Sequence, residues 1–171
     1  YMILCFICYF IFDIGTHLES TYFYLFYAAN IPFILGKELF LLGHFWSLAV
    51  EEQFYMFWPW LNKLRIGLLK NIIFVLVFLL IGSKLILHFV FPGTIAELTI
   101  HVTRFHCMLI GCYASILYFE KHPFFIKVTT SKIAQLIAWG VIILVATNSF
   151  HLASVVDNEI ISFITVLIIL G

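Results

Sequence analysis

Long apolar runs separated by short polar breaks form the pattern of this chain. Four of these runs predict helices of roughly the length that crosses a bilayer, which takes about 20 residues. They cover residues 45–61, 71–91, 102–119 and 133–150. A last run begins at Glu159, and residues 1–12 form an apolar run that is too short to span. The pattern predicts an all-α, polytopic transmembrane helix bundle.

The region from Ser20 to Leu42 departs from this pattern. It is aromatic and apolar but interrupted by the polar or helix-breaking residues Asn30, Pro32, Gly36, Lys37 and Glu38. Because proline lacks a backbone N–H and clashes with the preceding helical turn, we expect a surface-lying or re-entrant segment here. A full span is the alternative, and it would reverse the orientation of every helix that follows.

The basic residues divide the loops into two kinds. Residues 62–70 and 120–132 hold six of the nine Lys and Arg residues, whereas residues 92–101 and 149–158 hold none. Basic loops stay on the cytoplasmic side of a membrane. We therefore expect the first two loops inside and the other two outside.

This orientation places the ionisable side chains of the spans in the outer half of the membrane. Glu51 lies about 9 Å and Lys84 about 10 Å from the outer ends of their helices, at about 1.5 Å per residue. A charge near the bilayer centre costs about 2.5–3.5 kcal/mol, so a shared polar cavity would satisfy these groups. Lys84 either snorkels to the outer surface or pairs with Glu51 or Glu52. Arg104 is expected to be a fixed cation facing the cavity, with an interfacial anchor as the alternative.

Composition narrows the class of protein. The 171 residues are 64% hydrophobic and 11% charged, with a mean hydropathy of +1.11, whereas soluble domains carry about 25% charged residues. No basic tract indicates a nucleic-acid partner. Cys5 and Cys8 have CxxC spacing, but no second pair follows, so we expect no metal site. Because both ends of the chain lie within apolar runs, we expect residues 1–171 to be part of a single transmembrane domain, truncated at both ends.

One predicted span carries most of the candidate chemistry. Ser47, Glu51 and Tyr55 recur every four residues and so share one face of a helix, with Glu52 about 100° away from Glu51. Acidic residues early in a helix suit its dipole, but two carboxylates within an apolar span favour a functional polar site. Ser47 either caps the helix or takes part in that site.

The neighbouring residues allow structural and functional interpretations side by side. Tyr55 and Gln53 either hydrogen-bond within the bundle or contact substrate, and Trp46 either packs at the membrane interface or contacts substrate. The candidate catalytic residues are Glu51, Ser47, Arg104 and Glu52. The candidate substrate-binding residues are His44, Trp46, Tyr55, Gln53 and Lys84. His44 is the weaker candidate, because a lone histidine beside aromatic residues is usually structural.

Residues 44–59 read HFWSLAVEEQFYMFWP. They closely resemble the H-x-W-S-L-[SA]-V-E-E-Q-F-Y-L-x-W-P signature of acyltransferase family 3, a family of integral-membrane O-acyltransferases. Thr103-Arg104-Phe105 resembles a second family stretch, and Asn30 resembles an asparagine that precedes the signature. Divergent family members vary the second acid, so the resemblance favours Glu51 over Glu52. His106 stands where family members more often carry an acid or a small residue.

The resemblance implies an enzyme of about ten helices in a bacterial inner or plasma membrane. Such an enzyme moves an acyl group, here expected to be acetyl, from acyl-CoA to a hydroxyl of a cell-surface polysaccharide or similar extracytoplasmic acceptor. It implies acetyl-CoA as donor substrate and no bound cofactor. Glu51 would hold the base histidine in its tautomer, and Arg104 or Lys84 would stabilise the oxyanion or hold a donor phosphate.

The family's base histidine lies in an amino-terminal helix that no stretch here matches. We therefore expect it upstream of Tyr1 and expect this chain alone to be inactive. Two other classes stay open. A transporter or channel subunit would use Glu51, Lys84 and Arg104 as a relay or binding set, although the inverted repeats that would favour it are not seen. A non-catalytic membrane scaffold is the third possibility.

Overall fold

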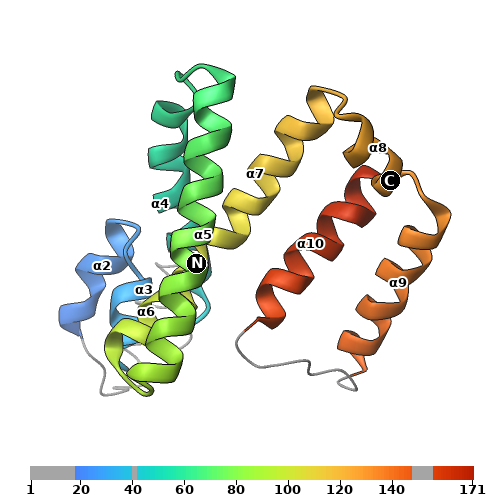
Figure 1. The fold of residues 1–171 in the computed structure, drawn as a ribbon. Helices are drawn as coiled ribbons and strands as arrows, with labels where there is room; N and C mark the ends of the chain where they lie inside the picture. The colour runs from blue at the N-terminus through green and yellow to red at the C-terminus, as the bar shows by residue number, and fades with distance from the viewer. Residues whose placement is uncertain (1–17, 40–41, 148–155) are drawn as a thin grey trace. The chain divides into compact units, whose positions relative to one another are not determined.

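A computed structural model describes residues 18–39, 42–147 and 156–171 (Figure 1). These residues form helices and connecting turns without strands, which confirms the all-α prediction. The helices are η1 (Leu18–Ser20), α2 (Thr21–Leu25), α3 (Asn30–Ile34), α4 (Phe45–Leu61), α5 (Ile66–Val90), α6 (Ile95–Thr103), α7 (Phe105–Phe119), α8 (Pro123–Thr129), α9 (Lys132–Ala146) and α10 (Asp157–Leu170). The run at residues 1–12 and most of the loop at 149–158 lie outside the described residues.

The chain divides into two compact units. The first contains α2, α3, α4 and α6, and the second contains α5 and α7 to α10. The chain passes between the units after residues 63, 92 and 103. The last passage falls at Arg104, between α6 and α7, where the backbone takes the left-handed conformation with φ 47° and ψ 26°. The signature helix α4 thus belongs to the first unit, and Lys84 and Arg104 belong to the second.

In the first unit, α3 packs against α4 and α6. The described part of the region from Ser20 to Leu42 contains only short helices, α2 and α3 being five residues each, in agreement with the predicted non-spanning segment. Pro32 is the third residue of α3. Its missing N–H costs little in a first helical turn, where backbone N–H groups have no acceptor within the helix.

Two hydrogen bonds join the segment that follows α3 to residues at the start of this region. The hydroxyl of Ser20 donates to the carbonyl of Lys37 at 2.8 Å, and the backbone N–H of Leu39 donates to the hydroxyl of Tyr24 at 3.1 Å. Burial raises the pKa of Tyr24, although the bond from Leu39 lowers it in part. The segment therefore returns the chain to the start of α4 in a fixed arrangement.

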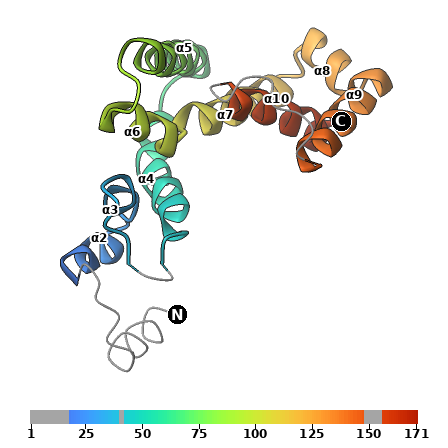
Figure 2. The same cartoon turned by 90° about the horizontal axis from the view of Figure 1, so that it is seen from below.

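In the second unit, α5 and α7 run antiparallel and α10 lies between α7 and α9 (Figures 1 and 2). Lys70, near the start of α5, pairs with Glu120 just after α7 at 2.7 Å. Gln135 of α9 donates to the carbonyls of Thr129 and Leu167, at 2.9 and 2.5 Å, and so ties α8 and α10 together. These contacts fix the end of the unit at which α5 begins.

Two predicted boundaries are wrong. Helix α5 begins at Ile66 rather than at residue 71, and most of the predicted loop at 92–101 is helix α6. The start of α6 is stabilised by a variant of the capping box. The N–H of Glu97 donates to the hydroxyl of Thr94 at 3.3 Å, and the N–H of Gly93 donates to the Glu97 carboxylate at 2.6 Å. The T-x-x-E spacing was the available sequence signal for this helix.

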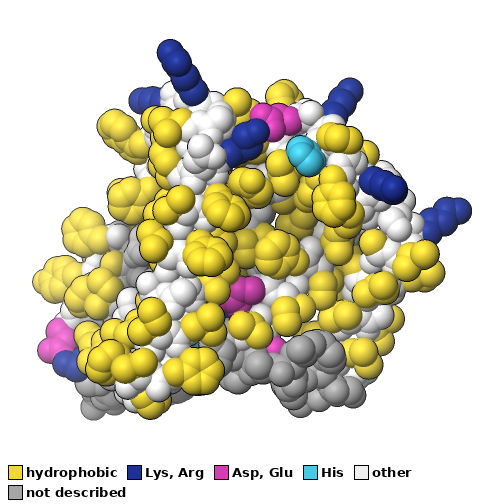
Figure 3. All heavy atoms as spheres, in the orientation of Figure 1, with side chains coloured by type: hydrophobic (Ala, Val, Ile, Leu, Met, Phe, Trp, Pro, Cys, Tyr) yellow, Lys and Arg dark blue, Asp and Glu magenta, His cyan; other side chains and the backbone are white. Residues whose placement is uncertain are grey.

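Two stretches of the described residues are long and apolar enough to cross a membrane, Ile66–Val90 and Ile95–Phe119. Helices α8 and α9, bent by 57° at their junction, would make a third if they form one span. Helix α4, predicted as a span, has 17 residues and is not among these stretches. Large apolar side chains cover the visible surface (Figure 3). These features indicate a membrane protein.

Five of the seven Lys and Arg residues of the second unit lie at one end of it, where dark-blue atoms appear in Figure 3. That end is formed by the start of α5, the end of α7, α8 and the start of α9. The residues are Arg65, Lys70, Lys121, Lys127 and Lys132. The predicted cytoplasmic loops therefore converge, as a single orientation in the membrane requires.

We expect single cysteines at Lys63 and Ala96 to lie on opposite sides of the membrane. Both positions are exposed. Gly93 is less suited, because its φ of 75° favours glycine. In the complete protein without other cysteines, an impermeant thiol reagent added outside intact cells should label Ala96→Cys and spare Lys63→Cys until the cells are opened. Equal labelling from outside would contradict the orientation.

Candidate functional site

Helix α4 presents the predicted serine, glutamate and tyrosine on one exposed face. Ser47, Glu51 and Tyr55 are all exposed, Tyr55 to 57%. The helix cap lies at His44, and the Ser47 hydroxyl donates back to the His44 carbonyl at 3.1 Å. Ser47 therefore does not cap the helix, which rules out one of its two interpretations. Its role in a polar site stays a prediction.

The two adjacent carboxylates differ in exposure. Glu51 is exposed and Glu52 is half-buried. Among the described residues of their own unit, neither carboxylate has a hydrogen bond or an ion pair. A carboxylate on the surface of an apolar helix is costly in lipid. The oxygens of Glu51 are thus available to a partner such as an imidazole N–H.

Gln53 has a structural role. Its amide donates to Oδ1 of Asn30 at 2.8 Å and to the carbonyl of Tyr27 at 3.0 Å, and it accepts from Nδ2 of Asn30 at 3.3 Å. Asn30 is 5% exposed, so it needs such partners. The asparagine that precedes the signature and the glutamine within it therefore form one contact between α3 and α4.

The aromatic residues around the signature pack within the first unit. Trp46 stacks on Phe33 with ring centroids 5.2 Å apart, which supports its packing interpretation. The exposed His44 ring lies 4.8 Å from the ring of Phe45. A hollow of about 330 Å³ opens beside the start of α4. Its lining residues are Tyr24, Leu25, Tyr27, Ala29, Phe45, Leu48 and Ala49, none of them a predicted site residue.

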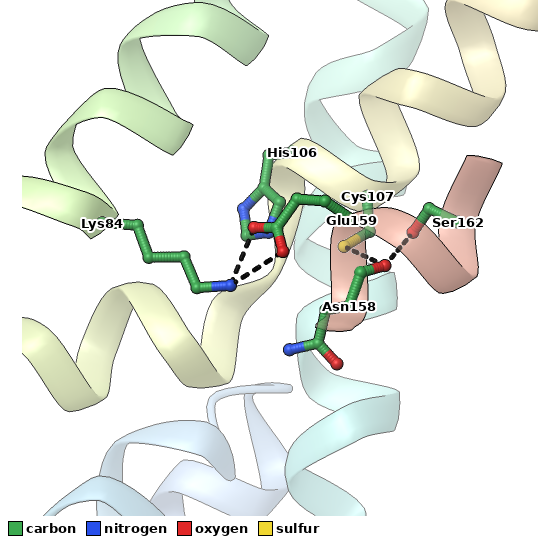
Figure 4. Close-up of polar contacts among 6 residues, drawn as sticks. All are labelled: Lys84, His106, Cys107, Asn158, Glu159 and Ser162. Atoms are coloured by element: carbon green, nitrogen blue, oxygen red, sulfur yellow. Dashed lines mark hydrogen bonds and ion pairs between the residues drawn. The ribbon is translucent and has the colours of Figure 1, made fainter. Parts of the chain in front are cut away.

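A second polar cluster lies inside the second unit, where three helices meet (Figure 4). Nζ of Lys84 on α5 donates to both carboxylate oxygens of Glu159 on α10, at 2.7 and 3.1 Å. Nε2 of His106 on α7 lies 2.9 Å from Oε1 of the same carboxylate, although without the alignment of a hydrogen bond. Lys84, His106 and Glu159 are 4%, 1% and 6% exposed.

This cluster corrects the interpretation of Lys84. The side chain is buried rather than snorkelling to a surface, and the acid that it pairs with in its own unit is Glu159. An acid in the first turn of an apolar helix is readily explained by the helix dipole, which is why the sequence did not single out Glu159. A charged residue within an apolar run was nevertheless a signal for an intramembrane partner.

One further contact joins the first turns of α7 and α10, and it shares its acceptor with a hydrogen bond within α10. The thiol of Cys107 and the hydroxyl of Ser162 both point to the carbonyl of Asn158, at 3.7 and 2.7 Å (Figure 4). Arg104 immediately precedes α7 and is half-buried. Arg104 and Lys84 both belong to the second unit. In the described parts of the chain, no group of three or more His, Cys, Asp or Glu could hold a metal ion.

Half of the chain is related to a protein of named activity. A stretch of 96 residues, 53% of this chain, is 34% identical to the O-acetyltransferase OatA of Staphylococcus aureus, and strains NCTC 8325, COL and MRSA252 give the same value. The match covers 15% of the OatA chain, so this chain spans a small part of that relative's length. No family model and no solved structure matches. The relationship is consistent with the resemblance to acyltransferase family 3 inferred from the signature.

Proposed function

We propose, on the premise of this relationship to an O-acetyltransferase, that the chain is part of a membrane O-acyltransferase. The reaction would transfer an acetyl group from acetyl-CoA to a hydroxyl of a cell-surface polysaccharide or a similar acceptor outside the cell. The observation that carries the proposal is the 34% identity over 96 residues. The signature on α4 supports it, because its acid and its hydroxyls share an exposed face.

In this proposal Glu51 orients the histidine that acts as the catalytic base. The acceptor hydroxyl must lose a proton to attack the thioester, and a histidine on another helix of the complete enzyme would take it. A carboxylate that accepts the other imidazole N–H holds the ring in the right tautomer and stabilises the imidazolium that forms. Glu51 suits this role because its carboxylate is exposed on α4 and has no bond to the described residues of its unit.

Arg104 is the better of the two cations for the developing negative charge. Lys84 is buried and its ammonium group already donates twice to Glu159. A guanidinium presents several N–H groups in a planar fork that fits an oxyanion or a phosphate. Arg104 would therefore stabilise the oxyanion of the transition state. The relative's named activity favours an enzyme over a transporter or a scaffold.

The proposal is tested on the complete protein in proteoliposomes, with acetyl-CoA labelled in the acetyl group on one side and surface polysaccharide on the other. We expect label on the polysaccharide and release of free CoA only when both substrates are present. A longer acyl-CoA in parallel tests the choice of acetyl. Release of CoA no greater than from empty vesicles, with folded protein present, would contradict an acyltransferase.

A further inference from the structure

Glu159 has no part in the chemistry proposed so far, yet its carboxylate is tightly held. Both oxygens accept from Lys84, and one of them also lies 2.9 Å from His106. Its side chain is 7% exposed. A buried pair of charges contributes little net stability against apolar side chains of the same size. Stability alone is therefore a weak reason for this cluster.

The contacts of this cluster hold one short stretch of backbone, the first turn of α7. His106 lies in the first turn of α7 and contacts α10 through Glu159, while its neighbour Cys107 contacts α10 through the carbonyl of Asn158. Two adjacent residues thus hold the start of α7 against α10. Lys84 adds α5 to the same point (Figure 4).

Arg104 depends on that stretch. It is the residue before α7, and its φ of 47° and ψ of 26° lie in the left-handed region. A non-glycine residue in this region costs free energy and persists where the surrounding structure holds it. The first turn of α7 supports Arg104 on its carboxyl-terminal side, and the contact between His106 and Glu159 holds that turn in place.

We propose that Glu159 is a positioning residue for acyl transfer: by holding His106 and Lys84 it fixes the first turn of α7, and through it the place of Arg104. The inference rests on the proposed function, in which Arg104 stabilises the transition state. An oxyanion exists in the transition state and not in the bound substrate. Loss of Glu159 should therefore lower kcat rather than raise KM for acetyl-CoA.

The informative variant removes both charges together. Lys84→Met/Glu159→Leu leaves no buried charge unpaired and keeps the volume of both side chains, so the fold should be kept. We expect a melting temperature in detergent at or above that of the wild type. We expect kcat to fall about 10- to 100-fold, the range for a small misplacement of a catalytic group, with KM for acetyl-CoA within about threefold.

Two further variants separate position from charge. Lys70→Met/Glu120→Leu removes the ion pair at the other end of α5 and α7, where the side chains are 27% and 29% exposed. It should leave kcat within about twofold, because exposed pairs contribute little. Glu159→Asp keeps the charge but shortens the side chain, so it should melt close to the wild type with an intermediate kcat.

The outcomes distinguish this inference from the function on which it rests. A folded wild-type protein without acyl transfer would overturn both. An active wild type with an equally active and stable Lys84→Met/Glu159→Leu variant would show that Glu159 serves packing alone, and would leave the acyltransferase proposal intact. A raised KM with unchanged kcat would likewise overturn the positioning role, because it would place the cluster in substrate binding.

Discussion

Replacing Glu51 by glutamine should lower acetyl transfer by the complete protein about 10³- to 10⁴-fold, the loss expected when a base histidine loses the acid that holds its tautomer. Glutamine has nearly the same shape, so α4 should still form and insert. Glu51 is exposed on α4, so we expect the substitution to leave the packing of the helix intact. The measurement is kcat in proteoliposomes, at equal amounts of folded protein.

Glu52→Gln is the internal comparison, because this residue is next in the sequence but about 100° around the helix. We expect it to keep most of the activity. Glu120→Gln, which removes an acid from a partly exposed ion pair of the second unit, should match the wild type. Activity kept in Glu51→Gln but lost in Glu52→Gln would show that the second acid carries the function.

The second large effect concerns stability rather than activity. Lys84→Met alone should destabilise the protein by about 3–5 kcal/mol, because it leaves the Glu159 carboxylate buried without its ammonium partner. The bilayer adds to this cost, since no water replaces the lost bonds. Thermal unfolding of the detergent-purified protein, monitored by the reactivity of the half-buried thiols of Cys107 and Cys112, should show a large fall in the midpoint.

Lys70→Met is the matched control for this prediction. It makes the same substitution on the same helix, but its ion pair is partly exposed and should contribute about 1 kcal/mol or less. A Lys84→Met variant that melts with the wild type would mean that Glu159 finds another partner or loses its charge. Both variants make the same chemical change. The difference between their melting midpoints therefore measures the effect of burying the ion pair.

Much of the helical organisation follows from the sequence alone. The runs at 71–91, 102–119 and 133–150 correspond to α5, α7 and α9 within a few residues at most ends, because an apolar run is a local property. The spacing of Ser47, Glu51 and Tyr55 likewise placed them on one face of α4, since helical periodicity fixes which residues share a face. Helix α6 was missed, although its T-x-x-E start was a local signal.

Only the tertiary structure decided which polar residues meet. Lys84 and Glu159 are 75 positions apart, and Gln53 and Asn30 are 23 apart. No periodicity relates residues on different helices, so the sequence could state that Lys84 needs an acid but not which one. The acid was decided when α10 packed between α7 and α9, because that packing brings the first turn of α10 to the end of α5 that carries Lys84. Because the cluster is buried among apolar helices, each charge depends on the partner that the packing brings to it.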